Sequence, residues 1–359
     1  MLIFRYLAKE VFVTLAALTT ILMLIFMSNQ FVRYLGRVAN GQIPLAIIMK
    51  LMMLELPNLM GLVLPLGFYV ALLIAYGRLY AENEMTVLRA CGYSPAKLLK
   101  HSYIMAIFVS GLVMTLVLWV SPMIAIERTK LLRTTGVQTI IQTVTPGRFR
   151  AISQGKQVFY VESMSRNHQK ANNIFLARQV IQDKQPHWEV LWANQAFAQT
   201  DTKSKEDYLI LANGSQYEGL PGRADYRVLN FEQYKARLPH PTVELKNDTR
   251  TIKTKNLWPL LNPDKYKAAE LQWRFSIPLM VLILTLIAIP LSKANARSGK
   301  FAKLLPAIIL YIFYANLMFI ARNWMISGKI SPVVGMWWVH LTILLIGLLL
   351  IWRNWTKLE

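Results

Sequence analysis

The stretch Val11–Val32 reads VFVTLAALTTILMLIFMSNQFV and contains no charged residue. A helix needs about 20 apolar residues to cross the hydrocarbon core of a bilayer, so this stretch is long enough to span it. Five further stretches are equally free of charge: Leu56–Gly77 (which Leu51–Leu54 extends beyond Glu55), Ser102–Ile126, Phe275–Ser292, Leu304–Ala321 and Ile330–Trp352. The sequence therefore predicts a membrane α-helical protein with six transmembrane helices.

The composition agrees with this interpretation. Hydrophobic residues make up 54% of the 359 residues and charged residues only 16%, against roughly 25% charged residues in soluble domains. The apolar content excludes a disordered chain, and a single cysteine, Cys91, excludes a disulfide scaffold. The formal net charge of +21 would also suit nucleic-acid binding, but most of the excess borders the apolar stretches, which is typical of membrane proteins and of contact with anionic lipids.

Lys and Arg in the short loops predict the orientation, because cytoplasmic loops are enriched in them. If the N-terminus is cytoplasmic, the loops after the second and the fourth span also lie in the cytoplasm, and both are basic. The first contains Arg78, Arg89, Lys97 and Lys100, and the second contains Lys293, Arg297, Lys300 and Lys303. Arg353 and Lys357 then place the C-terminus on the same side. No small-x-small cleavage pattern follows the first span, so we interpret it as an uncleaved anchor. The prediction is a multi-pass membrane protein with both termini in the cytoplasm and the long insert on the other side of the membrane.

The chain between the third and fourth spans changes to short β-prone runs, such as Gln157–Met164, Asn173–Val180 and Tyr226–Phe231, with turn residues such as Asn213-Gly214-Ser215 between them. Evenly spaced short strands of this kind are typical of a sandwich or jelly roll. We expect three parts: residues 1–126 with three transmembrane helices and a cytoplasmic helix at about 80–92, residues 127–270 as a β domain outside the cytoplasm, and residues 271–359 with the last three transmembrane helices.

Motifs for chemistry are missing from the sequence. It contains no Gly-x-x-x-x-Gly-Lys-Ser/Thr loop for ATP and no paired cysteines or His-x-x-x-His spacing for a metal. His340 stands alone in the last span, where a packed helix contact is at least as good an interpretation as a proton relay. We therefore expect no catalytic residue, no metal, no cofactor and no enzymatic activity in this chain.

One cytoplasmic loop carries a distinctive pattern, GRLYAENEMTVLRACGYS at residues 77–94. Met85, Leu88 and Cys91 can share one face of a short helix, while acidic residues gather at its N-terminal turn, where the helix dipole favours them. Gly92 is placed to end the helix. Such a helix suits a groove on an ABC ATPase, and it also suits the membrane surface; composition leaves these two interpretations about even.

This loop segment, Leu79–Gly92, together with Arg5–Glu10 (RYLAKE) and Leu64-Pro65-Leu66, resembles the lipopolysaccharide export permeases of the LptF/LptG family, and within it the LptF branch. The order of three spans, β domain and three spans resembles that family over essentially the whole chain. The resemblance implies a permease that forms a heterodimer with LptG, is driven by two copies of the ATPase LptB, and is joined by LptC. It also implies a bacterial inner membrane as the location and makes residues 127–270 a periplasmic β-jelly-roll domain. The cargo implied is lipopolysaccharide, which passes from the inner membrane towards the outer membrane.

The resemblance also implies site residues. Arg33 and Arg322 match basic positions that face lipopolysaccharide, so we expect them to contact its phosphates; Arg suits phosphate through its planar fork. Arg37 is a further candidate, although interfacial snorkelling is the better account of Arg37 and of Lys50. The apolar candidates for the lipid cavity are Phe26, Leu62, Leu66, Ile308, Ile312 and Phe319. For the ATPase contact we expect Glu84 first and Glu82 second, with Met85, Leu88 and Arg89 beside them.

Three alternatives remain at this point. A lipoprotein-releasing permease also combines membrane spans with an external domain, but such permeases have four spans with the large domain after the first. A membrane-anchored assembly factor of the envelope would need no ATPase partner and no transport role. A membrane enzyme would need a nucleophile with its base, or a metal site, and the sequence offers neither.

Overall fold

The computed structural model describes residues 2–39, 43, 45–143, 146–152, 157–165, 170–182, 185–200, 207–220, 226–237, 249–258, 264–293 and 304–355. Arg297, Lys300, Lys303 and Lys357, which contributed to the predicted orientation, lie outside these residues. Two compact units are present. The first combines Met1–Val32, Met49–Thr129 and Lys246–Glu359, and the second combines Arg33–Ile48 and Lys130–Leu245.

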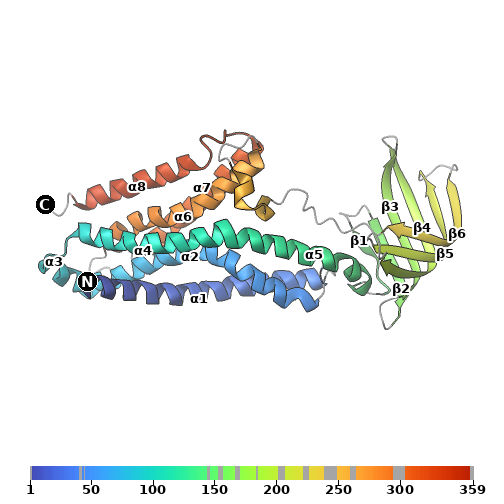
Figure 1. Ribbon diagram of the computed structural model, residues 1–359, viewed down its shortest axis with the longest axis horizontal. Coiled ribbons are helices and arrows are strands. Elements are labelled where there is room, and N and C mark those ends of the chain that lie inside the picture. The colour runs from blue at the N-terminus through green and yellow to red at the C-terminus, as the bar shows by residue number, and fades with distance from the viewer. Residues whose placement is uncertain are drawn as a thin grey trace. The chain divides into compact units, whose positions relative to one another are not determined.

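The apolar stretches form long helices, as predicted (Figure 1). They are α1 (Leu2–Ala39), α2 (Ile48–Ala81), α4 (Pro95–Thr115), α5 (Ser121–Thr143), α6 (Lys265–Ser292), α7 (Leu304–Ser327) and α8 (Trp337–Trp355), with the short α3 (Glu84–Ala90) between α2 and α4. Within the described chain, five helical stretches are long and apolar enough to cross a membrane, and α8 is a shorter apolar helix. The predicted membrane α-helical fold is confirmed. Helix α8 corresponds to the sixth predicted span, Ile330–Trp352.

The third span is one continuous helical stretch with a change of pitch. Between α4 and α5, residues Leu116–Val120 form a π-helical turn, and the helix then runs on to Thr143. Ser94 caps its start by accepting a hydrogen bond from the Lys97 amide, with Pro95 at the first helical position. The helix therefore extends beyond residue 126, where the uncharged stretch ends.

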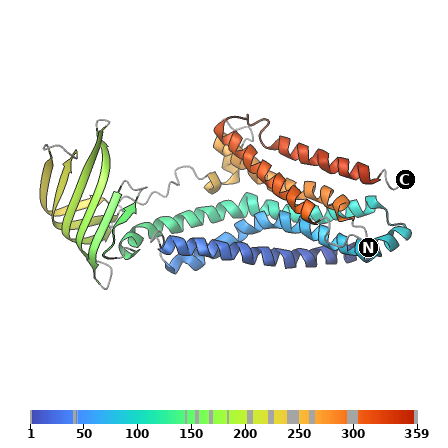
Figure 2. The same cartoon turned by 180° about the vertical axis from the view of Figure 1, so that it is seen from behind.

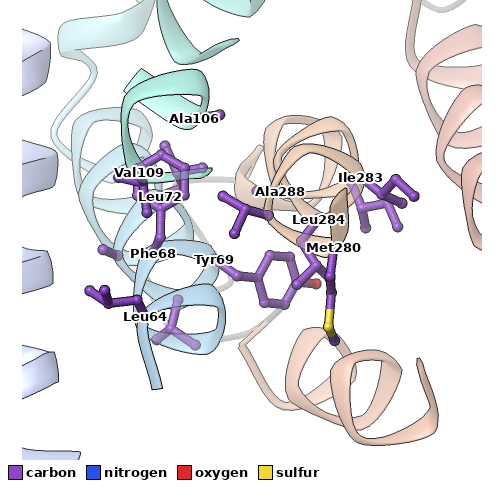
Figure 3. Packing of buried hydrophobic residues seen from close by; sticks show 14 of the residues in the cluster. Leu64, Phe68, Tyr69, Leu72, Ala106, Val109, Met280, Ile283, Leu284 and Ala288 are labelled. Atoms are coloured by element: carbon purple, nitrogen blue, oxygen red, sulfur yellow. The ribbon is translucent and has the colours of Figure 1, made fainter. Parts of the chain in front are cut away.

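Helices α2 and α6 form the centre of the first unit. In the apolar 18-residue segment of each of these two helices, 72% is buried, against 11% in the corresponding segment of α1 and 22% in that of α7. Figure 3 shows Phe68 and Leu72 of α2 facing Val109 of α4, and Tyr69 of α2 pointing towards Leu284 of α6. The Tyr69 hydroxyl also donates to the Ala307 carbonyl of α7 across 3.3 Å. Few residues of α1 and α7 are therefore buried within this chain.

The inserted β domain is confirmed; β2 has the bounds of the run that predicted it, whereas β3 and β6 are longer than their runs. They are β1 (Arg150–Ile152), β2 (Gln157–Met164), β3 (Lys170–Gln182), β4 (Gln185–Thr200), β5 (Asp207–Gly219) and β6 (Arg227–Arg237). They form one antiparallel sheet in chain order, which Figure 2 shows from behind. Each described strand pairs with its sequence neighbours, so the described strands are connected as a meander.

The predicted turn at Asn213-Gly214-Ser215 was wrong, because these residues lie inside β5. Asn213 adopts a left-handed conformation with φ 50°, which asparagine tolerates better than most residues. The strand continues past it, with Ala212 opposite Gln195 and Gly214 opposite Ala193 on β4. The sequence signal therefore marks a local bend of the strand, and the pairing on both sides keeps the chain extended.

Candidate functional site: the loop helix and the buried charges

Helix α3 is shorter than the predicted segment and lies against its own chain. It begins after Asn83, whose φ of 61° is left-handed, and Gly92 follows its end with φ 81°. Met85 is 1% exposed, and Leu88 packs against the same core. Val87 and Cys91 are exposed instead. The side of α3 that carries Val87 is thus open, whereas Met85 anchors the helix.

The charged residues of the loop contact neighbouring helices. The Tyr6 hydroxyl of α1 donates a 2.6 Å hydrogen bond to Glu84. Arg78 forms an ion pair of 2.5 Å with Glu10 of α1, and its Nε lies 4.0 Å from Glu82. Two polar contacts therefore join the first turns of α1 to the end of α2 and the start of α3.

Arg89 and Tyr93 hold the other side of the loop. Arg89 donates to the Tyr80 hydroxyl across 3.1 Å and stacks over its ring at 5.6 Å. The Tyr93 hydroxyl lies 2.6 Å from His101 Nδ1, and burial raises the pKa of Tyr93 to about 12, so this hydroxyl stays protonated at neutral pH.

Arg322 lies in a cluster of buried charges at the start of α6. Its Nη2 donates to Glu270 Oε2 across 2.6 Å, and Arg274 Nε donates to Glu270 Oε1 across 3.1 Å. The Arg322 guanidinium also lies over the Trp273 ring, 5.0 Å from its centre. Two guanidiniums therefore share the one carboxylate of Glu270.

Arg33 and Arg37 lie on the last turns of α1, and both are exposed. The Arg37 guanidinium is 5.8 Å from the centre of the Tyr34 ring. These two residues belong to the second compact unit, whereas Arg322 belongs to the first.

The apolar candidates have different surroundings. Phe26, Leu62, Ile312 and Phe319 are exposed within this chain, while Leu66 and Ile308 are half-buried. Phe319 contacts Trp273 with ring centres 5.0 Å apart, which places it beside Arg322. Ile308 and Ile312 are one turn apart on α7, so they share a face of that helix.

Sequence reasoning missed two buried ion pairs. Glu270 and Arg274 stand four residues apart directly before an uncharged stretch, a spacing that favours pairing on one helix face. Glu55 is 8% exposed and lies 3.5 Å from Arg128. That second pair joins residues 73 positions apart, so no local pattern indicates it.

His340 is packed between helices. Its Nδ1 lies 2.6 Å from the Tyr314 hydroxyl of α7, and the residue is 4% exposed. Among the residues that the structure describes, no group of three His, Cys, Asp or Glu side chains is placed to hold a metal ion.

These features define the class as a multi-pass membrane protein with an inserted β domain, a short helix in the loop between the second and third spans, and buried charges where α6 begins. The sequence profile of the lipopolysaccharide export system permease LptF/LptG family matches residues 5–353. The lipopolysaccharide export system permease proteins LptF of Escherichia coli (strain K12) and of Shigella flexneri are each 31% identical to it over 352 residues, which cover 98% of this chain and 94% of theirs. The chain belongs to the lipopolysaccharide export system permease LptF/LptG family.

Proposed function

We propose that this chain is the LptF-type permease subunit of an ATP-driven lipopolysaccharide exporter in a bacterial inner membrane. The observation that carries the proposal is the end-to-end match to the permease family, which includes both sets of helices and the β insert. A structural assembly factor or a lipoprotein permease is not favoured, because neither accounts for this match.

The proposed partners follow from the same family. An LptG subunit completes the heterodimer, and two LptB subunits hydrolyse ATP in the cytoplasm. In the periplasm, the β domain and LptC together receive the lipid. The exposed apolar residues of α1 and α7 support such an assembly. Only 11% and 22% of the apolar 18-residue segments of these two helices are buried within the chain, so a partner helix or a lipid can pack against them.

Within this assembly, α3 is the proposed contact for LptB. Its acidic first turn offers Glu84 and Glu82, and its open side carries Val87. The contacts of Glu84 with Tyr6 and of Arg78 with Glu10 support a role for α3 in passing movement of the ATPase to the membrane helices. A shift of α3 is passed directly to α1 through them.

The lipid is proposed to be held by cations and apolar side chains. Arg33 and Arg322 contact the phosphates of the lipid, and Arg37 lies one turn from Arg33 on α1. Phe26, Leu62, Leu66, Ile308, Ile312 and Phe319 line the path of the acyl chains. The exposure of Phe26, Leu62, Ile312 and Phe319 within the single chain supports this role.

The experiment is to purify the tagged full-length chain from its native membrane in mild detergent. Mass spectrometry identifies the co-purified proteins, and lipid analysis tests for bound lipopolysaccharide. Recovery of LptB and LptG subunits with lipopolysaccharide supports the proposal. A chain recovered folded but without an ATPase would contradict it.

A further inference from the structure

Glu270 is a buried carboxylate shared by two arginines. It is the sixth residue of α6, and its side chain is 6% exposed. Arg274, one turn further along α6, donates to one of its oxygens, and Arg322 of α7 donates to the other. The Glu270 carboxylate therefore links α6 to α7 where these two helices carry buried charges.

The two arginines differ in how firmly they are held. The Arg274 side chain is 3% exposed, and its remaining donors reach four acceptors of residues 249–254: the carbonyls of Thr249, Arg250 and Ile252 and the hydroxyl of Thr254, at 2.9–3.3 Å. The Arg322 side chain is 17% exposed and lies on the face of Trp273. Arg274 is thus fixed in place, and Arg322 is the partner with access to a ligand.

This arrangement lowers the cost of releasing Arg322. Removing one partner of a buried ion pair is normally costly, because the other charge is left uncompensated. Here Arg274 remains bound to Glu270 when Arg322 leaves, so the carboxylate keeps a cation and a hydrogen bond. Trp273 offers the Arg322 guanidinium a surface on which to turn without losing its stacking contact.

We propose that Glu270 is a positioning residue that holds Arg322 in the absence of cargo and gives it up to a phosphate of the lipid. A carboxylate and a phosphate monoester are both oxyanions that accept paired hydrogen bonds from a guanidinium, so one can replace the other on Arg322. This inference rests on the proposed function, and it adds a competitor for the Arg322 site within the chain itself. The competition weakens phosphate binding, and a weaker hold lets the lipid move on.

The test compares Glu270→Gln with wild type in the complete transporter, reconstituted in nanodiscs for binding and in vesicles for export. The probes are lipid A with both phosphates and lipid A without phosphates. We expect Glu270→Gln to bind phosphorylated lipid A about tenfold more tightly, the order of one charge-assisted hydrogen bond, while ATP-driven export becomes slower. Binding of the dephosphorylated probe stays as in wild type.

Four further variants make the result specific. Glu55→Gln neutralises another buried carboxylate, paired with Arg128, and is expected to leave both affinities unchanged. In Arg322→Gln, addition of Glu270→Gln is expected to have no further effect on binding. Glu270→Asp keeps the charge but shortens the side chain, so it is expected to bind more tightly than wild type even if Glu270→Gln does not assemble.

The outcomes separate the two proposals. If Glu270 variants assemble and bind phosphorylated lipid A with wild-type affinity, or shift both probes alike, Glu270 does not compete with phosphate and the inference is overturned. If the wild-type complex neither binds nor exports lipid A, the proposed function itself fails.

Discussion

The hydroxyl of Tyr6 donates a hydrogen bond of 2.6 Å to the carboxylate of Glu84, which joins the first helix to the loop helix across 78 residues of sequence. A second contact, Arg78 with Glu10, lies one turn further along α1. The buried residues of the first half of α1 that join the main core are Leu7, Val11 and Leu15, close to these contacts. Helix α1 is therefore held firmly at one end, and we expect movement of α3 to reach it there.

Tyr6→Phe removes this link and keeps the ring. We expect the ATPase to remain associated, since Glu84 is retained, while lipopolysaccharide exported per ATP falls by about fivefold at most, because one hydrogen bond is worth about 1 kcal/mol. The measurement is ATP hydrolysis and lipid export by the same vesicles. Thr20→Ala is the control, because the Thr20 hydroxyl bonds the Ala16 carbonyl of its own helix. Unchanged export per ATP in Tyr6→Phe would show that α1 does not receive its movement through this contact.

Glu84→Ala distinguishes a docking role from a helix-capping role. If Glu84 only stabilises the first turn of α3, its loss costs about 0.3–1 kcal/mol and the ATPase still co-purifies. If it contacts LptB, we expect the ATPase to be lost while the permease remains folded. Glu82→Ala is expected to have the smaller effect, because that carboxylate lies 4.0 Å from Arg78. Co-purification at wild-type yield with both variants would exclude the docking role.

Arg33→Glu reverses a charge that is proposed to contact lipid phosphate. We expect crosslinking to lipopolysaccharide to fall on the order of tenfold, as for the loss of a charge-assisted hydrogen bond, with assembly intact. Lys50→Glu is the matched control, because it is an exposed cation at the start of α2 that snorkelling explains. Equal losses in both variants would point to general surface charge, and transport at the wild-type rate in Arg33→Glu would reject the contact.

Gly214→Ala tests the bend in β5. An added Cβ would overlap the Trp192 carbonyl and lie 2.7 Å from the Phe231 ring, so we expect the β domain to lose about 1–3 kcal/mol of stability. Limited proteolysis of the full-length chain in nanodiscs measures this as faster cleavage within the insert. Gly36→Ala in α1 is the control, because nothing lies within 4 Å of its added Cβ. Cleavage at the same rate in both variants would show that the strand accommodates the methyl group.

Several features of the fold were predictable because their causes are local. Uncharged runs of about 20 residues predict membrane helices wherever they occur, and the β-prone runs between them predicted the inserted domain. The helix bounds were harder to predict: α5 continues to Thr143 because a helix does not have to end where its apolar stretch ends. The bend at Asn213 shows the same limit. The turn-prone pair Asn213-Gly214 could be recognised in the sequence, but the pairing of β5 with β4 and β6, which continues the strand past it, could not.

The candidate site divides in the same way. The sequence by itself determined the membrane helices, the β insert and the acidic first turn of the loop helix, because each depends on residues close together in the chain. Only the tertiary structure decided that Glu84 meets Tyr6 and that Arg322 shares Glu270 with Arg274. These partners are brought together by the packing of separate helices, and a buried charge finds its partner by proximity in space.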